Sequence, residues 1–382
     1  MADRHTDVYR RVQRLIAEEQ PVILDGGVAT ELERIGIKDY RTSDKSHWGI
    51  WALYHAPHSV LEVHRRYVDV GCDVISTNTW AIISAQEMEG RTALDQRGRS
   101  HWMDVARMGV RLARQAVEEG GRAGQCAVAF SLNGDVSQRS HLGTLELLSR
   151  AFESDPPDLI LMETISLIRD DLTVPAVEAM LRTGLPVWLS FRRCRHGVCS
   201  VYGNHWGGPE GDLFGRSAHE FERMGVGALL MNCLPVDHVP DMLPWLRDFT
   251  DMPLGVYPNL GRYLDPGWRF DERVEPEDYA LLARHWREEG AQIVGGCCGV
   301  TPEHIAAVRE RLKGTRPGLR REAAGASGLH PGGAPETRTL NVPRPWTDEQ
   351  GRTLYPLPFP EIVCDAGVFR PTQGSFLGVS SE

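Results

Sequence analysis

Hydrophobic residues along this chain gather in short runs, separated by longer stretches in which apolar and polar residues alternate with helical spacing. The short runs, rich in Val, Ile and Leu, predict eight strands, over residues 21–24, 73–77, 127–130, 158–162, 186–191, 227–233, 253–257 and 291–294. The amphipathic stretches predict helices, over residues 7–19, 30–35, 59–70, 93–119, 143–153, 174–182, 216–224 and 276–289. Apolar strands separated by helices are typical of parallel strands that helices cover. Their number favours a closed α/β barrel of the (β/α)8 type over an open doubly wound sheet.

The last part of the chain has a different character. Residues 313–345 are rich in Gly, Pro, Ala and Arg without a clear period, which is typical of a linker or extended arm, and residues 354–369 regain apolar and aromatic side chains. The sequence therefore predicts a barrel over residues 1–314 and a C-terminal extension over residues 315–382. Two interpretations of the extension stay open: an arm that wraps the barrel or a second subunit, giving a homo-oligomer, and a partly ordered tail.

Composition and charge narrow the possible partners. The 382 residues carry 42 basic and 52 acidic side chains, a net charge of -10, and no basic stripe is present, so nucleic acid is not expected as a partner. The N-terminus lacks the apolar core of a signal peptide, and no run approaches the ~20 apolar residues of a membrane span. We expect a cytoplasmic protein without membrane contact. Its eight cysteines are then expected to be thiols or metal ligands rather than disulfides.

Polar residues and cysteines stand where the predicted strands end. A barrel brings all these carboxyl ends to one face, and the residues that would meet there are Asp25, Asn78, Glu163, Cys233, Cys297 and Cys298. Because the eighth strand lies beside the first, Asp25 is expected close to the glycine-flanked pair Cys297 and Cys298. Three cysteines with one open position form the pattern of a catalytic Zn²⁺ site, since structural zinc is closed by four protein ligands. The alternative is that they are buried apolar thiols.

An all-thiolate zinc site suits a particular chemistry. Three thiolates and Zn²⁺ have a net charge of about -1, which makes the metal a weak activator of water but allows it to hold a substrate thiol as the reactive thiolate. The sequence contains no H-x-H or H-E-x-x-H ligand set. Zinc hydrolase chemistry is therefore not expected. A dinucleotide site is not expected either, because residues 25–30 after the first strand lack the G-x-G-x-x-G spacing.

Four motifs, in order and at matching strand ends, resemble those of the homocysteine S-methyltransferase family across roughly residues 20–313. They are Asp25-Gly26-Gly27 with Thr30-Glu31-Leu32, Glu163-Thr164, Met231-Asn232-Cys233, and Gly295-Gly296-Cys297-Cys298-Gly299 with Pro302-Glu303-His304-Ile305. The glycine-flanked double cysteine with its upstream Asn-Cys is the most specific of them.

The resemblance implies a TIM barrel and a methyltransferase of methionine biosynthesis. It implies that Cys233, Cys297 and Cys298 bind zinc and that Asp25 and Glu163, the predicted catalytic residues, hold the amino end of homocysteine. The zinc-bound thiolate would attack a methyl group on a positively charged donor by in-line displacement. We expect Asn78 and Asn232 to be further substrate-binding residues. Asn78 as a turn cap, Asn232 as a residue that orients the site, and Asp25 as a turn acid are the alternatives.

The chain departs from the family around the expected donor pocket. Residues 130–134 lack the Gly-Pro turn that the family often shows, and the loop over residues 192–211 carries Cys194, His196 and Cys199. That Cys-x4-Cys spacing indicates either a second metal site or a solvated loop. Aromatic candidates for a cage around a cationic donor are Trp48, Trp51, Trp80, Tyr202, Trp206 and Tyr257.

These departures leave three questions of function open. The donor could be S-methylmethionine, S-adenosylmethionine or betaine. The acceptor could be homocysteine or another thiol or selenol. A catalytically silent barrel that binds zinc or a thiol is the alternative from a different functional class.

Overall fold

The computed structural model of the chain describes most of the barrel and little of the extension. The described residues are 5–36, 49–91, 101–166, 168–194, 197–199, 205–207, 211–260, 262–264, 267–269, 274–318, 346–347, 353–354, 362–365 and 368–371.

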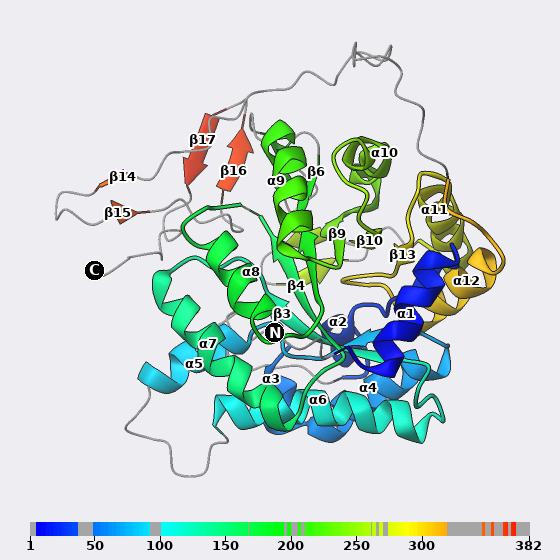
Figure 1. Cartoon of the computed structure of the whole chain (residues 1–382), viewed down its shortest axis with the longest axis horizontal. Coiled ribbons are helices and arrows are strands. Elements are labelled where there is room, and N and C mark those ends of the chain that lie inside the picture. The colour runs from blue at the N-terminus through cyan, green and yellow to red at the C-terminus, as the bar shows by residue number, and fades with distance from the viewer. Residues whose placement is uncertain are drawn as a thin grey trace.

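Eight parallel strands form a nearly closed barrel (Figure 1). They are β1 (Val22–Ile23), β2 (Val74–Ser76), β3 (Ala127–Asn133), β4 (Leu159–Ile165), β5 (Val187–Phe191), β9 (Ala228–Pro235), β10 (Leu254–Asn259) and β13 (Ile293–Val294). Their spatial order follows their order in the chain, and an isolated parallel bridge between Leu24 and Val74 joins the first strand to the second. The predicted α/β barrel is confirmed, with a strand at each of the eight predicted positions.

Helices surround the strands (Figure 1). They are α1 (Asp7–Ala17), α2 (Val28–Arg34), α3 (Trp51–His55), α4 (Pro57–Asp69), α5 (Ile82–Arg91), α6 (Trp102–Glu119), α7 (Arg139–Ser154), α8 (Thr173–Leu181), α9 (Gly211–Met224), α10 (Met242–Arg247), α11 (Pro276–Glu288) and α12 (Pro302–Leu312). The helix predicted over residues 93–119 begins only at Trp102, because His101 is extended and its side chain caps the N-terminus. Its first part, residues 93–100, lies outside the described residues. The helices α3, α5 and α10 were not predicted, and α3 and α10 span too few turns to show a period.

Short antiparallel strands lie outside the barrel. The segment over residues 192–211, expected to be a loop, contains the strands β6 (Arg193–Cys194), β7 (Gly197–Cys199) and β8 (His205–Gly207). A hairpin of β11 (Arg262–Leu264) and β12 (Gly267–Arg269) follows β10. In the extension, β14 (Trp346–Thr347) pairs with β15 (Thr353–Leu354), and β16 (Ile362–Asp365) pairs with β17 (Val368–Pro371). The boundary at residue 314 and the oligomer through the arm stay predictions. No described helix is both long and apolar enough to cross a membrane.

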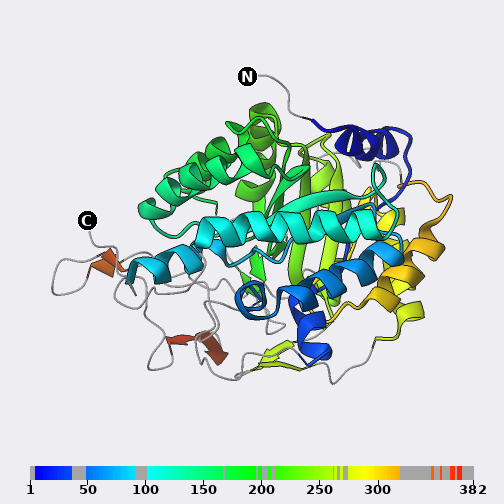
Figure 2. The ribbon, with the colours of Figure 1, turned by 90° about the horizontal axis from the view of Figure 1, so that it is seen from below.

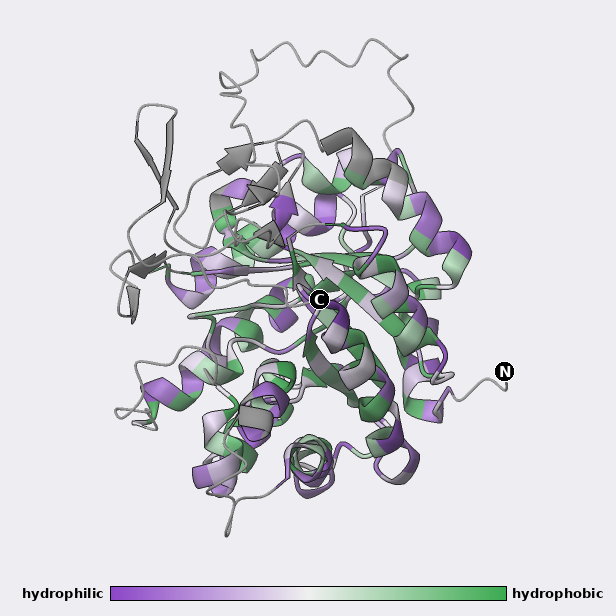
Figure 3. Cartoon of the chain, turned by 90° about the vertical axis from the view of Figure 1, so that its left-hand side faces the viewer, coloured by the Kyte–Doolittle hydropathy of each residue, from purple (hydrophilic) through white to green (hydrophobic). Residues whose placement is uncertain are grey.

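Side chains of the strands alternate between the barrel interior and its outer face, as the two-residue period of a strand requires. The interior residues, among them Val22 and Leu24, form one apolar cluster with Tyr9 and Val12 of α1. The outward residues pack against the helices in a second cluster, and Figure 3 shows the hydrophobic strands under helices with hydrophilic outer faces. Helix α1 closes one end of the barrel, opposite the β11–β12 hairpin (Figure 2), and there Trp188 donates its indole N–H to the Tyr9 hydroxyl at 3.1 Å.

At the carboxyl end of the barrel, the inward positions change from apolar to polar. Six strands each carry a polar residue two positions after an interior residue of the apolar cluster. These polar residues are Ser76, Ser131, Glu163, Ser190, Asn232 and Asn259. The period of two therefore aims a polar layer into the barrel mouth, above its apolar interior.

Candidate metal centre

Three cysteine side chains converge at the mouth. Cys233 lies near the end of β9, whereas Cys297 and Cys298 follow β13, and β10 lies between these two strands. The three sulfur atoms all lie within 4.8 Å of one another, with 3.9 Å between those of Cys297 and Cys298. Zn–S bonds of about 2.3 Å in a tetrahedron place two sulfurs about 3.8 Å apart. The donor set therefore fits a zinc ion, and it is the only such cluster among the described residues.

Asn259, at the end of β10, hydrogen-bonds to cysteines on both sides of its strand, Cys298 after β13 and Cys233 on β9. Its side-chain oxygen accepts the backbone N–H of Cys298 at 3.2 Å, and its side-chain nitrogen donates to the sulfur of Cys233 at 3.9 Å. The N–H of Cys297 donates to the carbonyl of Pro258 at 2.9 Å. Asn259 was not predicted as a site residue, although it stands at the end of the seventh strand, as the predicted residues do at the ends of theirs.

Local conformation and electrostatics distinguish Cys233 from the other two cysteines. Its φ of 55° lies in the left-handed region, which a residue with a Cβ adopts only when its surroundings hold it there. Hydrogen bonds from Cys297 and Cys298 hold its pKa well below the usual value, against the opposing effect of burial, and Arg192 lowers the pKa further. The hydrogen bonds within the cluster therefore favour negative charge on the Cys233 sulfur.

The turn that carries Asp25 and the turn that carries the paired cysteines pack directly against each other. The N–H of Gly296 donates to the carbonyl of Asp25 at 2.9 Å. A Cβ on Gly26 would lie 2.4 Å from the carbonyl oxygen of Val300, and one on Gly27 would lie 2.5 Å from that of Cys297. Only glycine fits such close backbone contact, which explains the Asp-Gly-Gly motif and confirms that Asp25 lies close to the paired cysteines.

Glu163 lies in the barrel mouth with both carboxylate oxygens hydrogen-bonded. Ser131 donates to one oxygen, and Tyr257 (3.1 Å) and the Asn232 amide (3.3 Å) donate to the other. Burial raises the pKa of Glu163 to about 7, although the bonds from Ser131 and Tyr257 lower it. The acid is therefore fixed in orientation and costly to ionise without a cation nearby.

Asp25 is the second buried acid of the mouth. Its carboxylate accepts the N–H of Ser76 at 2.7 Å and the Ser76 hydroxyl at 3.0 Å. Burial raises the pKa of Asp25 well above its usual value, Ser76 lowers it, and the nearby charge of Glu163 raises it again. None of the ion pairs between described residues involves Asp25 or Glu163. The two acids thus have no basic ion-pair partner among the described residues, and a cation bound beside the cysteines would favour their ionised forms.

The two predicted asparagines differ in their surroundings. Asn232 accepts the N–H of Thr164 at 3.0 Å and the hydroxyl of Ser190 at 2.8 Å, and its amide reaches Glu163. It thereby links the Glu163-Thr164 turn to the strand that carries Cys233. Asn78 instead donates to the carbonyl of Gly49, 29 residues earlier in the chain, at 2.7 Å. A substrate contact by either asparagine stays a prediction.

Of the six aromatic candidates, Tyr257 is buried and contacts Glu163, whereas Trp51 and Trp80 are half-buried. Trp48, Tyr202 and the side chain of Trp206 lie outside the described residues. The same holds for His196 and for the side chains of Cys194 and Cys199, so the second metal site and the donor cage stay predictions.

Comparison with known proteins decides the family. A family model described as homocysteine S-methyltransferase matches residues 22–312, the whole barrel. The chain belongs to the homocysteine S-methyltransferase family. This membership makes it an enzyme of the methyl-transferring class, as the four motifs predicted.

Relatives within the homocysteine S-methyltransferase family differ in their stated acceptor. Homocysteine S-methyltransferase 3 of Zea mays is 26% identical over 328 residues, covering 76% of this chain and 90% of its own. Homocysteine S-methyltransferase YbgG of Bacillus subtilis is 26% identical over 315 residues, covering 77% and 95%. A selenocysteine Se-methyltransferase of Brassica oleracea var. italica is also 26% identical, over 324 residues, covering 77% and 89%.

A solved member of the family supports the fold. The homocysteine methyltransferase MmuM of Escherichia coli, described as the metallated form, superposes with a TM-score of 0.57 at 23% identity and covers 78% of this chain and 99% of its own. The cysteine cluster found here is consistent with a metal site in a member of this family.

Proposed function

We propose that this chain is a zinc-dependent methyltransferase that moves a methyl group from a cationic donor to the thiol of homocysteine, giving methionine. The observation that carries the proposal is the joint placement of three sulfur ligands and two buried acids in one barrel mouth. An amino thiol matches both halves of this site, because its sulfur is a metal ligand and its ammonium group is a cation.

The sulfur half would be built by Cys233, Cys297 and Cys298. A zinc ion held there would supply one open position at which a substrate thiol is kept as its thiolate at neutral pH. The protein's own contribution is to orient these ligands: Asn259 hydrogen-bonds both the Cys298 backbone and the Cys233 sulfur, and the strained φ of Cys233 aims its side chain.

The acidic half would be built by Asp25 and Glu163. Each carboxylate is already held by neutral donors, Ser76 for the first and Ser131, Tyr257 and Asn232 for the second. A substrate ammonium would offset the cost of burying their charge and would be fixed in direction by both. The acids thus anchor one end of homocysteine while its sulfur points to the cysteine cluster.

Methyl transfer then requires alignment more than acid–base chemistry. The substrate sulfur would attack the methyl carbon of a sulfonium or quaternary ammonium donor, the new S–C bond forming as the bond to the positive centre breaks. The leaving group departs as a neutral sulfide or amine, so no proton has to be supplied to it. The acidic mouth also favours a cationic donor over an anionic one.

The test is a donor panel with the zinc-loaded full chain. Homocysteine is incubated with methyl-labelled S-methylmethionine, S-adenosylmethionine or betaine, and labelled methionine is measured. We expect transfer from at least one donor and its loss in Cys298→Ala, with the fold checked by circular dichroism. Zinc loading without transfer from any donor would instead support the silent barrel.

A second acceptor class has a specific observation in its favour. The selenocysteine Se-methyltransferase is as similar to this chain as the homocysteine enzymes are, and a selenol is a metal ligand of the same kind as a thiol. Competition between homocysteine and selenocysteine for one donor distinguishes the two, because the preferred acceptor has the higher kcat/KM.

A further inference from the structure

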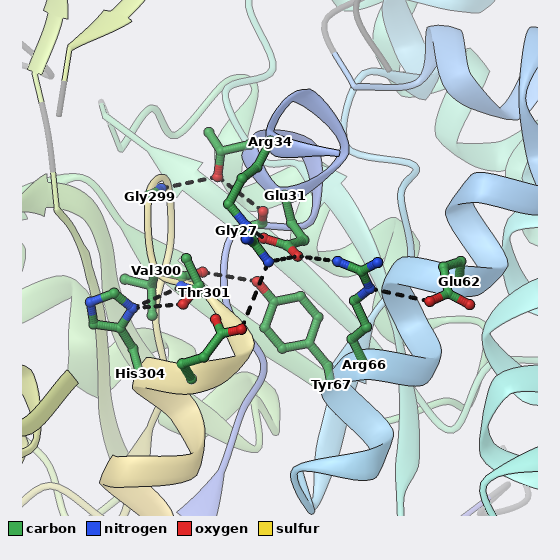
Figure 4. A network of polar contacts seen from close by, with 12 residues as sticks. Gly27, Glu31, Arg34, Glu62, Arg66, Tyr67, Gly299, Val300, Thr301 and His304 are labelled. Atoms are coloured by element: carbon green, nitrogen blue, oxygen red, sulfur yellow. Dashed lines mark hydrogen bonds and ion pairs between the residues drawn. The ribbon is translucent and has the colours of Figure 1, made fainter. Parts of the chain in front are cut away.

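The carbonyl oxygen of Val300 joins the two turns of the site. Val300 follows Cys298 by two residues, and its carbonyl accepts the N–H of Gly27, which follows Asp25 by two residues, at 3.0 Å. The same carbonyl accepts the hydroxyl of Tyr67 at 2.8 Å (Figure 4). One buried oxygen therefore ties together the cysteine turn, the Asp25 turn and helix α4.

A second link runs through Thr30 of α2. Its hydroxyl accepts the N–H of Gly299 at 3.0 Å and donates to the carbonyl of Gly27 at 3.0 Å. Thr30 of α2 therefore bonds directly to both turns, whereas Tyr67 of α4 bonds to the cysteine turn at the carbonyl that the Gly27 N–H also uses. Among the described residues, Thr30 is thus the side chain that hydrogen-bonds to both turns, and Tyr67 supports the carbonyl through which their backbones meet.

Helix α4 is itself anchored beside the site. Glu31 of α2 is buried and accepts both Arg34, at 2.6 and 2.7 Å, and Arg66, at 3.1 Å (Figure 4). Arg66 also pairs with Glu62 at 3.2 Å. Because Arg66 precedes Tyr67 directly, these ion pairs fix the position from which the Tyr67 hydroxyl reaches Val300.

We propose that Tyr67, assisted by Thr30, is a positioning residue that sets the separation between the cysteine turn and the Asp25 turn, and thereby the length of amino thiol that the site accepts. The inference rests on the proposed function. The affinity for a substrate that binds one turn through its sulfur and the other through its ammonium group depends on the separation of the two turns. A thiol without an amino group contacts the cysteine turn alone, so its affinity does not depend on that separation.

Binding of two probe thiols tests this proposal independently of turnover. The full chain is loaded with cobalt(II), and binding of homocysteine or 1-propanethiol is followed by the thiolate-to-cobalt absorption band. In Tyr67→Phe we expect homocysteine to bind about tenfold more weakly, the loss of roughly one hydrogen bond, and 1-propanethiol to stay within twofold. Thr30→Val, which preserves the shape of the side chain, is expected to give the same pattern.

Tyr9→Phe is the matched control, because it also removes a buried tyrosine hydroxyl, from the opposite end of the barrel. We expect comparable loss of thermal stability and unchanged binding of both thiols. Homocysteine affinity that stays within twofold in Tyr67→Phe and Thr30→Val, or equal weakening of both thiols, overturns the positioning role and leaves the proposed function intact. A wild-type chain that neither binds nor methylates homocysteine overturns both proposals.

Discussion

Asn259→Ala is the substitution that best tests how the metal centre is built. It removes the acceptor of the Cys298 N–H at 3.2 Å and the donor to the Cys233 sulfur at 3.9 Å. A buried N–H without a partner costs about 1–3 kcal/mol, whereas the longer bond to sulfur contributes less. We therefore expect zinc affinity to fall about 10- to 100-fold, the range typical of residues that orient metal ligands.

The assay is competition for zinc with a chromophoric chelator, run beside thermal unfolding of the metal-free chain. Asn259→Asp is the informative partner variant, since it retains an oxygen for the Cys298 N–H but removes the donor to sulfur and adds a negative charge beside the thiolates. We expect it to recover the stability of the metal-free chain but not the zinc affinity. Zinc binding by Asn259→Ala within twofold of wild type would refute the connecting role of this residue.

Three further changes probe the acid site, the packed turns and a buried histidine. Glu163→Gln should raise the KM for homocysteine about 10- to 100-fold, because a charge-assisted bond is lost, without lowering the melting temperature; an unchanged KM would exclude Glu163 as the ammonium anchor. Gly26→Ala should destabilise the fold by about 1–3 kcal/mol in urea unfolding, because the new Cβ collides with the Val300 carbonyl. Gly143→Ala is the control: nothing lies within 4 Å of its new methyl group, and alanine should stabilise helix α7. The ring nitrogens of His64 are buried and have no hydrogen-bond partner within the described part of the chain, and burial lowers the pKa of His64 to about 4. As the pH falls below about 6.5, His64 is therefore protonated in the unfolded chain before it is protonated in the folded chain, which favours unfolding. Between pH 7.5 and 5.0 the wild type should lose about 2 kcal/mol more free energy of unfolding than His64→Leu. Equal losses for the two proteins in urea unfolding would contradict this expectation.

Much of the fold follows from local pattern. The runs ending at Leu24, Met162 and Val294 are apolar apart from Asp158 and Gln292, so they indicate buried parallel strands without knowledge of their neighbours. Boundaries were less accurate, as at α6, because capping by His101 depends on a few atoms at the helix end. Helices as short as α3 and α10 have no readable period, and packing against the rest of the barrel determines them.

For the candidate site too, some residues could be predicted from the sequence and others only from the structure. Cysteines and acids at strand ends are visible in the sequence, because a barrel always brings those ends together. Asn259, Ser76 and Ser131 were missed because amides and hydroxyls are common in turns, and only their distances to a sulfur or a carboxylate distinguish them. Tyr67 stands in the middle of an amphipathic helix, where sequence alone predicts a core residue.

The sequence by itself therefore determined the class of fold and identified the three cysteines and the two acids as candidate site residues, since strand period and residue chemistry are local properties. Tertiary structure alone decided the geometry of the site: sulfurs within 4.8 Å, a carbonyl shared by two turns, and glycines where a methyl group would collide with backbone. The last two of these features arise between segments more than two hundred residues apart, as Tyr67 and Val300 are. The physical reason is that hydrogen bonds and close packing depend on tenths of an ångström, which a pattern of residue types does not encode.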